Sequence, residues 1–238
     1  MKITVINGTQ KQGVTYKLKE IFLDELRDKA EITEFYLPKD CPGFCLGCTA
    51  CFLEDENKCK DREHVAKIEE SMLAADLLVF ATPTYVYHAT GAMKAMLDHF
   101  GYRWMVHRPA KEFFGKRAFI ITQSIGSGEK SAAQDIKDSL SWWGVSDIRQ
   151  CRFKLMSGIF WDKLPEGKRA SMTASLRKAA AHYKNTDYSK PARTSISTKA
   201  KFYAARFVQN RVKKSDQRGT DYRYWEELGW IGSGRPWK

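Results

Sequence analysis

The sequence has no long hydrophobic run. Its longest apolar-leaning stretch, residues 77–87, is interrupted by Thr82, Pro83 and Thr84, so it is too short and too polar for a membrane-spanning helix. At the N-terminus, Lys2 is followed by only four mostly apolar residues, whereas a secretory signal needs a longer apolar region. These absences argue against a helical membrane protein and against a secreted one, and they predict a cytoplasmic location.

Acidic residues are scarce relative to basic ones. The 238 residues include 40 Lys and Arg but 28 Asp and Glu, a formal net charge of +12. This balance excludes an acidic solvating protein and leaves anionic ligands, nucleic acid and membrane surfaces as partners. The surplus is uneven, because +7 of it lies in residues 191–238. An apolar content of 43% is enough for a sizeable core.

The chain also lacks a Pro/Gly/Ser-rich linker and internal repeats, and strand-like and helix-like patterns alternate along it. Strand-like segments at 3–6, 31–36, 77–81, 118–121 and 148–155 alternate with helical patterns. After the second segment, an irregular cysteine-rich loop is expected from residue 38 to about residue 60, before a helix that Asp61 can cap. Strands that alternate with helical crossovers form a parallel sheet covered on both faces. We therefore expect an α/β fold, a doubly wound five-stranded parallel sheet, over residues 1–185.

The first expected strand ends in a loop, residues 7–15, that is rich in glycine and hydroxyl groups. Its spacing approaches that of a Walker A loop, but Val14 occupies the position of the required lysine, which argues against an NTPase. The dinucleotide pattern Gly-x-Gly-x-x-Gly is also absent. Such a strand-to-helix turn suits a single phosphate; the alternative is a plain capped turn. The expected phosphate-binding residues are Gly8, Thr9, Lys11, Gly13, Val14 and Thr15.

A second motif follows the third expected strand, in residues 82–99. It resembles the Pro-x-Tyr, Gly-x-Met-Lys and Asp-Arg pattern of the NADPH-dependent FMN reductases, with His99 in place of the usual Arg. The matching positions are Pro83, Tyr85, Gly91, Met93, Lys94 and Asp98. The phosphate loop resembles the same family, with departures at Gln10 and Val14.

The resemblance covers about residues 1–185 and implies a flavodoxin-like fold that binds FMN. It also implies NAD(P)H as reductant, a small-molecule or protein electron acceptor such as a flavin, quinone or nitro compound, and a homodimer or higher homo-oligomer. In flavodoxin-like order, the ligand lies between the first and third strands, at their C-terminal ends. The residues expected around the flavin ring are Pro83, Thr84, Tyr85, Val86, Tyr87, Thr122, Gln123, Ser124 and Gly126.

Several side chains near this loop have two interpretations. Tyr85 and Tyr87 either flank the ring or pack in the core. His88 is a candidate proton donor, or else a solvated loop residue. Lys94 and Asp98, four residues apart on one helix face, form either an ion pair or part of the catalytic site.

The six cysteines indicate redox or metal chemistry in a cytoplasmic protein. Cys45, Cys48, Cys51 and Cys59 have spacing that resembles the cluster loop of iron–sulfur flavoproteins, which implies a [4Fe–4S] cluster. A zinc site, a redox loop of thiols or disulfides, and inert packing are the alternatives. Cys151 is expected to be a buried core thiol.

Residues 186–238 are expected to form a basic, aromatic helical extension. Tyr203, Phe207 and Val208 have helical spacing, and basic residues including Lys213 and Lys214 surround them. Such a helix binds membrane or nucleic acid, or it docks on its own domain or on a partner subunit. The terminal aromatic residues favour docking, and no nucleic-acid motif accompanies them, so we expect no nucleic-acid partner.

Three functions follow from these patterns. The first is an FMN-dependent NAD(P)H oxidoreductase that reduces a small-molecule acceptor. The second is an iron–sulfur flavoprotein that carries electrons. The third is a non-enzymatic protein that binds an anionic surface, such as a membrane, through its basic tail.

Overall fold

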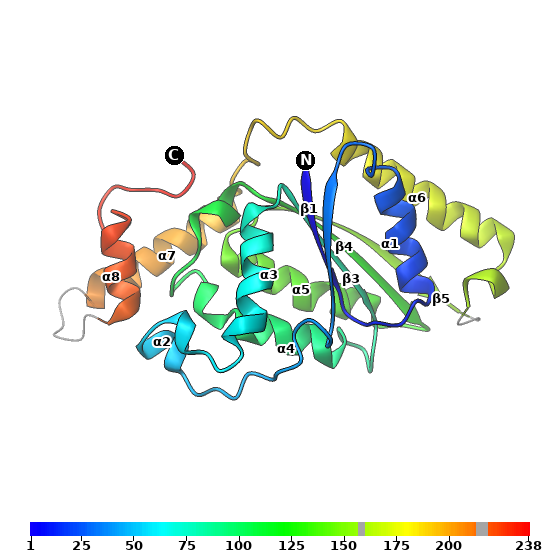
Figure 1. Cartoon of the computed structure of the whole chain (residues 1–238). Helices are drawn as coiled ribbons and strands as arrows, with labels where there is room; N and C mark the ends of the chain where they lie inside the picture. The colour runs from blue at the N-terminus through cyan, green and yellow to red at the C-terminus, as the bar shows by residue number, and fades with distance from the viewer. Residues whose placement is uncertain (157–159, 213–218) are drawn as a thin grey trace.

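A computed structural model describes residues 1–156, 160–212 and 219–238. It contains a five-stranded parallel sheet (Figure 1). The strands are β1 (Lys2–Asn7), β2 (Glu31–Tyr36), β3 (Leu77–Pro83), β4 (Arg117–Ile125) and β5 (Asp147–Leu155). The α-helices are α1 (Val14–Asp24), α2 (Ala50–Leu53), α3 (Arg62–Ala74), α4 (Gly91–His99), α5 (Glu129–Trp143), α6 (Glu166–Lys184), α7 (Ile196–Val212) and α8 (Thr220–Glu227). Short 3-10 helices are η1 (Glu56–Lys58), η2 (Gly101–Arg103), η3 (Lys111–Gly115) and η4 (Trp161–Lys163).

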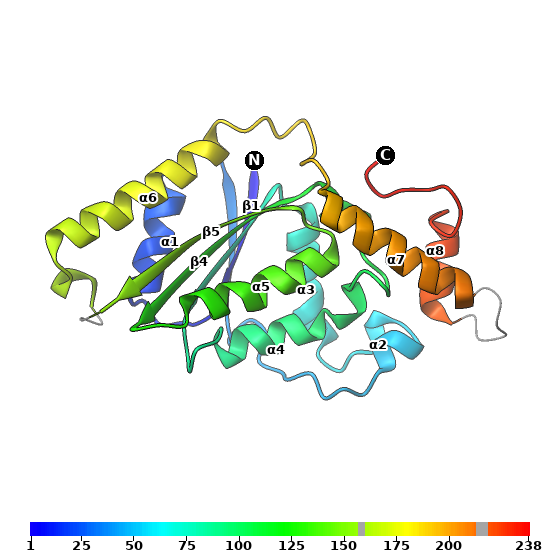
Figure 2. The ribbon, with the colours of Figure 1, turned by 180° about the vertical axis from the view of Figure 1, so that it is seen from behind.

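The sheet is covered on both faces, as the alternating pattern predicted. Apolar residues of α1 and α6 pack on one face, and those of α3, α4 and α5 pack on the other (Figure 2). Every residue of β3 is buried, which is why its sequence from Leu77 to Ala81 is apolar rather than alternating. The α/β, doubly wound fold is thereby confirmed.

The strand order is β2-β1-β3-β4-β5. The chain runs outward from β1 to β2 and then returns past β1 to β3, so the order reverses between β1 and β3. Ligands of doubly wound sheets bind at this point, beyond the C-terminal ends of the strands. The β1–α1 and β3–α4 loops therefore meet at the edge where a site is expected.

The cysteine-rich segment is more regular than expected. The sequence predicts an irregular loop from residue 38 to about residue 60, whereas the structure places α2 and η1 within it. Asp61, the expected side-chain cap of α3, lies at the N-cap position but makes no capping hydrogen bond. Its carboxylate instead faces His99.

The C-terminal extension contacts the rest of the chain through an aromatic cluster. Phe202, Trp225 and Trp230 pack with Met105 and Phe114 in a third group of buried apolar residues. The expected helix is present as α7, and Lys213 and Lys214 lie outside the described residues. The boundary between a 1–185 domain and a 186–238 extension stays a prediction. Within the described segments, no helix has the length and apolar character needed to cross a membrane.

Candidate functional site

The β1–α1 loop begins tightly against β3. The Gly8 amide donates to the carbonyl of Ala81 at 2.8 Å, and Thr90 Oγ1 donates to the Gly8 carbonyl at 2.6 Å. A Cβ atom on Gly8 would lie 2.4 Å from Thr82 Oγ1. Glycine is therefore required here by close approach, and it brings the loop directly beside the end of β3.

The loop ends at the N-terminus of α1, an 11-residue helix. Gly13 is its N-cap residue, with φ −91° and ψ −153°, and no side chain caps the helix. The first N–H groups of a helix have no partner within it, and the helix dipole places partial positive charge there. Lys11 and Thr15 add a cation and a hydroxyl beside these groups, so this end of the site fits a phosphate.

The β3–α4 loop forms a tight turn at its tip. Tyr85 and His88 exchange backbone hydrogen bonds of 2.9 and 3.1 Å, and between them Val86 and Tyr87 have φ values of 47° and 68°. Positive φ is strained for a β-branched residue such as Val86. The turn holds Tyr85 and Tyr87 at the surface, where these residues are 50% and 64% exposed.

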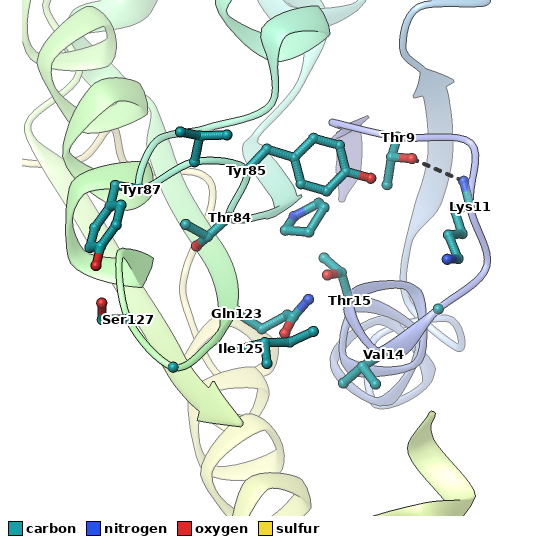
Figure 3. A pocket seen from close by; sticks show the side chains of 14 residues that line it. Thr9, Lys11, Val14, Thr15, Thr84, Tyr85, Tyr87, Gln123, Ile125 and Ser127 are labelled. Atoms are coloured by element: carbon teal, nitrogen blue, oxygen red, sulfur yellow. Dashed lines mark hydrogen bonds between the residues drawn. The ribbon is translucent and has the colours of Figure 1, made fainter. Parts of the chain in front are cut away.

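A cavity of about 420 Å³ lies between the β1–α1, β3–α4 and β4–α5 loops. In Figure 3, Lys11 and Thr15 lie on one side of this cavity, and Tyr87 and Ser127 lie on the other. Its lining residues are Thr9, Lys11, Gly13, Val14, Thr15, Pro83, Thr84, Tyr85, Val86, Tyr87, Gln123, Ile125, Gly126 and Ser127.

Two buried polar atoms in this lining have no protein partner. Thr84 Oγ1 and Gln123 Oε1 make no hydrogen bond to any described residue. Buried polar groups are normally hydrogen-bonded, because leaving one unpaired costs about 1–3 kcal/mol. A ligand with polar edges would satisfy both atoms. The cavity therefore offers an anion-binding end at α1 and polar partners at β3 and β4, which fits FMN.

Twelve of the fifteen expected cofactor residues line the cavity, and Gly8, Thr122 and Ser124 do not. Gly8, the first residue of the β1–α1 loop, lies against Thr82 and outside the cavity lining. Thr122 and Ser124 point to the start of α5, where they donate to the Glu129 carbonyl at 2.9 Å and to its carboxylate at 2.6 Å. These two residues position the β4–α5 loop rather than face the cavity.

Ile125 and Ser127 also line the cavity. The sequence places both in the segment that follows the fourth strand, residues 122–128, which is expected to close the other side of the pocket. Ile125 is 58% exposed at the end of β4.

His88 and the Lys94–Asp98 pair lie apart from the cavity lining. His88 Nδ1 is 3.2 Å from the Asp135 carboxylate on α5, and its side chain is 66% exposed. Lys94 and Asp98 form the expected i,i+4 ion pair on α4. The role of His88 as a proton donor stays a prediction.

All six cysteines are free thiols. Cys45 and Cys48 are exposed, and Cys51 and Cys59 are partly buried. Burial raises the pKa of Cys51, and nearby negative charge on Cys59, Cys45 and Cys48 raises it further. Cys151 is only partly buried, beside the α1–α6 face of the core.

The fold is that of a flavodoxin-like protein, and the cavity fits a phosphorylated, planar cofactor. Residues 1–157 match the family model of the NADPH-dependent FMN reductases, and the chain belongs to this family. The family prediction is thereby confirmed. The description of the family names FMN and NADPH.

Curated relatives carry two kinds of name. An iron–sulfur flavoprotein from Archaeoglobus fulgidus is 33% identical over 99 residues, 41% of this chain and 48% of that protein. An NAD(P)H-dependent FMN reductase from Pseudomonas aeruginosa is 37% identical over 87 residues, 36% of this chain and 44% of that protein. The chain thus spans about half the length of each of these two relatives.

A solved structure supports the fold. The FMN-dependent NADH-azoreductase of Bacillus anthracis, in complex with FMN, aligns with a TM-score of 0.59. The alignment covers 78% of this chain and 100% of the azoreductase, at 15% sequence identity. At this identity the likeness supports the flavodoxin-like fold and does not identify the substrate.

Proposed function

We propose that the protein is an FMN-dependent NAD(P)H oxidoreductase that reduces a small-molecule acceptor. The observation that carries this proposal is the cavity at the β1–β3 switch point. It combines an uncapped helix N-terminus at one end with the unpartnered buried atoms Thr84 Oγ1 and Gln123 Oε1 at the other. Bound FMN supplies the redox chemistry, so the protein itself needs no nucleophile.

In this proposal, the phosphate group of FMN binds at the start of α1. The N–H groups that follow Gly13 donate to it, Thr15 adds a hydroxyl donor and Lys11 adds positive charge. The Lys11 amide donates to Thr9 Oγ1 at 3.1 Å, which fixes the curvature of the loop around the anion. The close approach at Gly8 anchors the same loop to β3.

The flavin ring would lie between the β3–α4 and β4–α5 loops. Gln123 and Thr84 would hydrogen-bond its polar edge, and their loops are joined by a 2.8 Å bond from the Thr84 amide to the Gln123 carbonyl. Tyr85 and Tyr87 are too exposed to serve the core, and their rings are free to flank a planar ligand. These residues would bind, orient and shield the ring from water.

The acceptor class is inferred from the rim of the cavity. Val86 is 92% exposed, and Tyr85 and Ile125 are also exposed, so the rim is apolar and aromatic. Such a rim suits a planar organic acceptor, meaning a second flavin, a quinone or a nitro compound.

We also propose that a second copy of the chain packs beside this apolar rim. Analytical ultracentrifugation of the FMN-loaded protein would test this by detecting a dimer.

The test is FMN binding followed by turnover. The purified chain should bind about one FMN, and it should oxidise NADPH or NADH when a flavin, quinone or nitro acceptor is present. We expect Lys11→Ala to weaken FMN binding by roughly tenfold, since an ion pair with phosphate contributes about 1–2 kcal/mol. Lys17→Ala is the matched control, because Lys17 is an exposed lysine on α1 outside the cavity lining. Failure to bind FMN, or equal effects of both variants, contradicts the proposed site.

An iron–sulfur electron carrier is the second candidate function. It is favoured by the spacing of Cys45, Cys48, Cys51 and Cys59 along the sequence and by the name of the A. fulgidus relative. Anaerobic purification followed by iron and sulfide analysis tests it, since a [4Fe–4S] cluster requires about four of each per chain. Binding to an anionic surface through the tail is not proposed, because family membership favours a flavoenzyme.

A further inference from the structure

Behind the cysteine loop, the end of α4 carries a buried histidine among polar groups. The side chain of His99 is 1% exposed. Its Nε2 atom lies 3.2 Å from the Gly43 carbonyl, and its Nδ1 atom lies 3.7 Å from Cys59 Sγ. Asp61 Oδ2 lies 3.6 Å from Nε2.

These neighbours fix the tautomer of the ring. A carbonyl oxygen only accepts hydrogen bonds, so Nε2 carries the hydrogen and donates it to Gly43. Nδ1 then presents its lone pair toward Cys59 Sγ. A metal-binding histidine has the same arrangement, with one nitrogen free for the metal and the other N–H held by a backbone carbonyl or carboxylate.

The spacing of the donor atoms also fits a single ion. Cys59, Asp61 and His99 each offer one donor atom, and these three atoms lie within 4.8 Å of one another. Around a tetrahedral zinc ion, sulfur, nitrogen and oxygen donors are separated by roughly 3.4–3.6 Å, given bond lengths of about 2.0–2.3 Å. The 3.7 Å between Cys59 Sγ and His99 Nδ1 is close to this separation.

The surroundings favour a cation. Asp61 Oδ2 is buried and accepts no hydrogen bond from the described residues, and its ion-pair partner Lys60, at 3.5 Å, is 54% exposed. A divalent ion would offset the negative charge of this buried carboxylate.

We propose that Cys59, Asp61 and His99 bind one divalent metal ion of the zinc class, with the Gly43 carbonyl orienting His99. On binding, the Cys59 thiol releases its proton to solvent and its sulfur bonds to the ion, and His99 Nδ1 supplies a second protein ligand. The Asp61 carboxylate, whose Oδ2 lies 3.6 Å from Nε2, would turn toward the Nδ1 side to supply the third. The ion would join the segment before α3 to the end of α4. Because Cys59 cannot serve two metal centres, this site replaces the four-cysteine cluster.

The experiment measures metal content and affinity in the full-length protein. Purified chain, freed of loosely bound metal, is analysed for zinc, iron and sulfide and is then titrated with Zn²⁺ by calorimetry. We expect one zinc ion per chain, bound through mixed sulfur and nitrogen or oxygen ligands in X-ray absorption spectra. His99→Ala and Cys59→Ser should each weaken Zn²⁺ binding by at least about 100-fold.

Two matched variants act as controls. His64→Ala removes a histidine of α3 that is outside the donor group, and Cys45→Ser removes an exposed cysteine of the cluster loop; both should bind Zn²⁺ as the parent protein does. Because His99 is buried, circular dichroism and FMN content establish that each variant is folded, and Cys59→Ser provides a second, partly exposed position.

Three results would overturn the site. The first is bound iron and sulfide that are lost in Cys45→Ser. The second is an unchanged Zn²⁺ affinity in the folded His99→Ala protein. The third is the absence of stoichiometric metal binding. Each readout is independent of flavin reduction, so the metal site and the oxidoreductase function are tested separately.

Discussion

At the scale of single residues, two glycines of the phosphate loop have opposite surroundings. A Cβ atom on Gly8 would lie 2.4 Å from Thr82 Oγ1 and 2.8 Å from Thr82 Cβ, whereas a Cβ on Gly13 would meet nothing within 4 Å. We therefore predict that Gly8→Ala lowers the free energy of unfolding by about 1–3 kcal/mol and weakens FMN binding, because the loop must move away from β3.

Gly13→Ala is the control for this prediction. Gly13 has a negative φ, so alanine fits its backbone, and we expect a change in stability of less than about 1 kcal/mol. Urea unfolding and FMN titration of both variants provide the measurement. Equal stability losses in the two proteins would show that the contact between Gly8 and Thr82 is not decisive.

Single residues of the site could be predicted only where the local sequence dictates their position. Gly13 and Thr15 were predictable, because they lie at the junction of a β-branched run and a helical pattern. The orientation of Thr122 and Ser124 toward Glu129 was not, since α5 supplies the acceptor from the next element. The approach of His99 to Cys59 joins residues 40 positions apart and was likewise invisible in the sequence.

At the scale of elements, a buried lysine that directly precedes β4 caps the end of α3. Lys116 Nζ donates to the carbonyls of Leu73 and Ala75 at 2.6 and 2.5 Å. Burial lowers the pKa of Lys116 to about 8, and the opposing charges of Glu112 and Asp76 only partly offset this effect. The charged form is thus less favoured in the folded protein than in the unfolded chain.

This lowered pKa predicts how stability depends on pH. Between about pH 8 and pH 10.5, the unfolded chain keeps the Lys116 proton that the folded protein has lost, so this group makes the folded state relatively more stable as pH rises. The difference in unfolding free energy between the parent protein and Lys116→Met should therefore increase by about 2 kcal/mol from pH 7.5 to pH 9.5.

Urea unfolding of both proteins at the two pH values checks this expectation. Cysteines and tyrosines also titrate in this range, but their contributions cancel in the difference between the two proteins. A difference that stays constant or decreases with pH would mean that Lys116 remains solvated.

The larger elements could be predicted because their patterns are long. The composition of β3 is that of a buried strand, and the apolar period of α1 is that of a helix packed on one face. The short α2 and η1 were missed, because four or three residues carry too little pattern to separate a helix from a loop. Their positions depend on distant contacts, including the bonds from Thr220 Oγ1 to the carbonyls of Leu53 and Glu54.

At the scale of the whole molecule, the extension lies beside α2 and α5 at one end of the sheet. Asp221 of α8 accepts from Arg108 at 2.5 Å, and Arg108 also donates to the Cys51 carbonyl. Part of the basic character of the extension is directed inward, since Lys201 Nζ lies 4.5 Å from the ring centroid of Trp142. The high net charge of the tail is therefore compatible with docking on its own chain.

The last prediction concerns whether this extension and the sheet unfold together. Trp225 is fully buried, stacks on Phe202 with ring centroids 5.0 Å apart, and donates from Nε1 to the His107 carbonyl at 2.6 Å. Trp225→Ala should lower the free energy of unfolding by about 3–5 kcal/mol. Phe207→Ala, on the same extension but 57% exposed, should change it by less than about 0.5 kcal/mol.

Two probes of urea unfolding distinguish the outcomes: FMN release reports on the sheet domain, and tryptophan fluorescence reports on the whole chain, since Trp104, Trp142, Trp143 and Trp161 lie outside the extension. Because Asp221 and Phe202 link the extension to Arg108 and Phe114 of the sheet domain, we expect both transitions to shift together in Trp225→Ala. If only tryptophan fluorescence shifted, the extension would be an independent unit, and the division near residue 185 would mark two separately folding parts. If both shift, the FMN site depends on packing that lies outside the family-like region, and shortened forms of the chain should bind the flavin poorly.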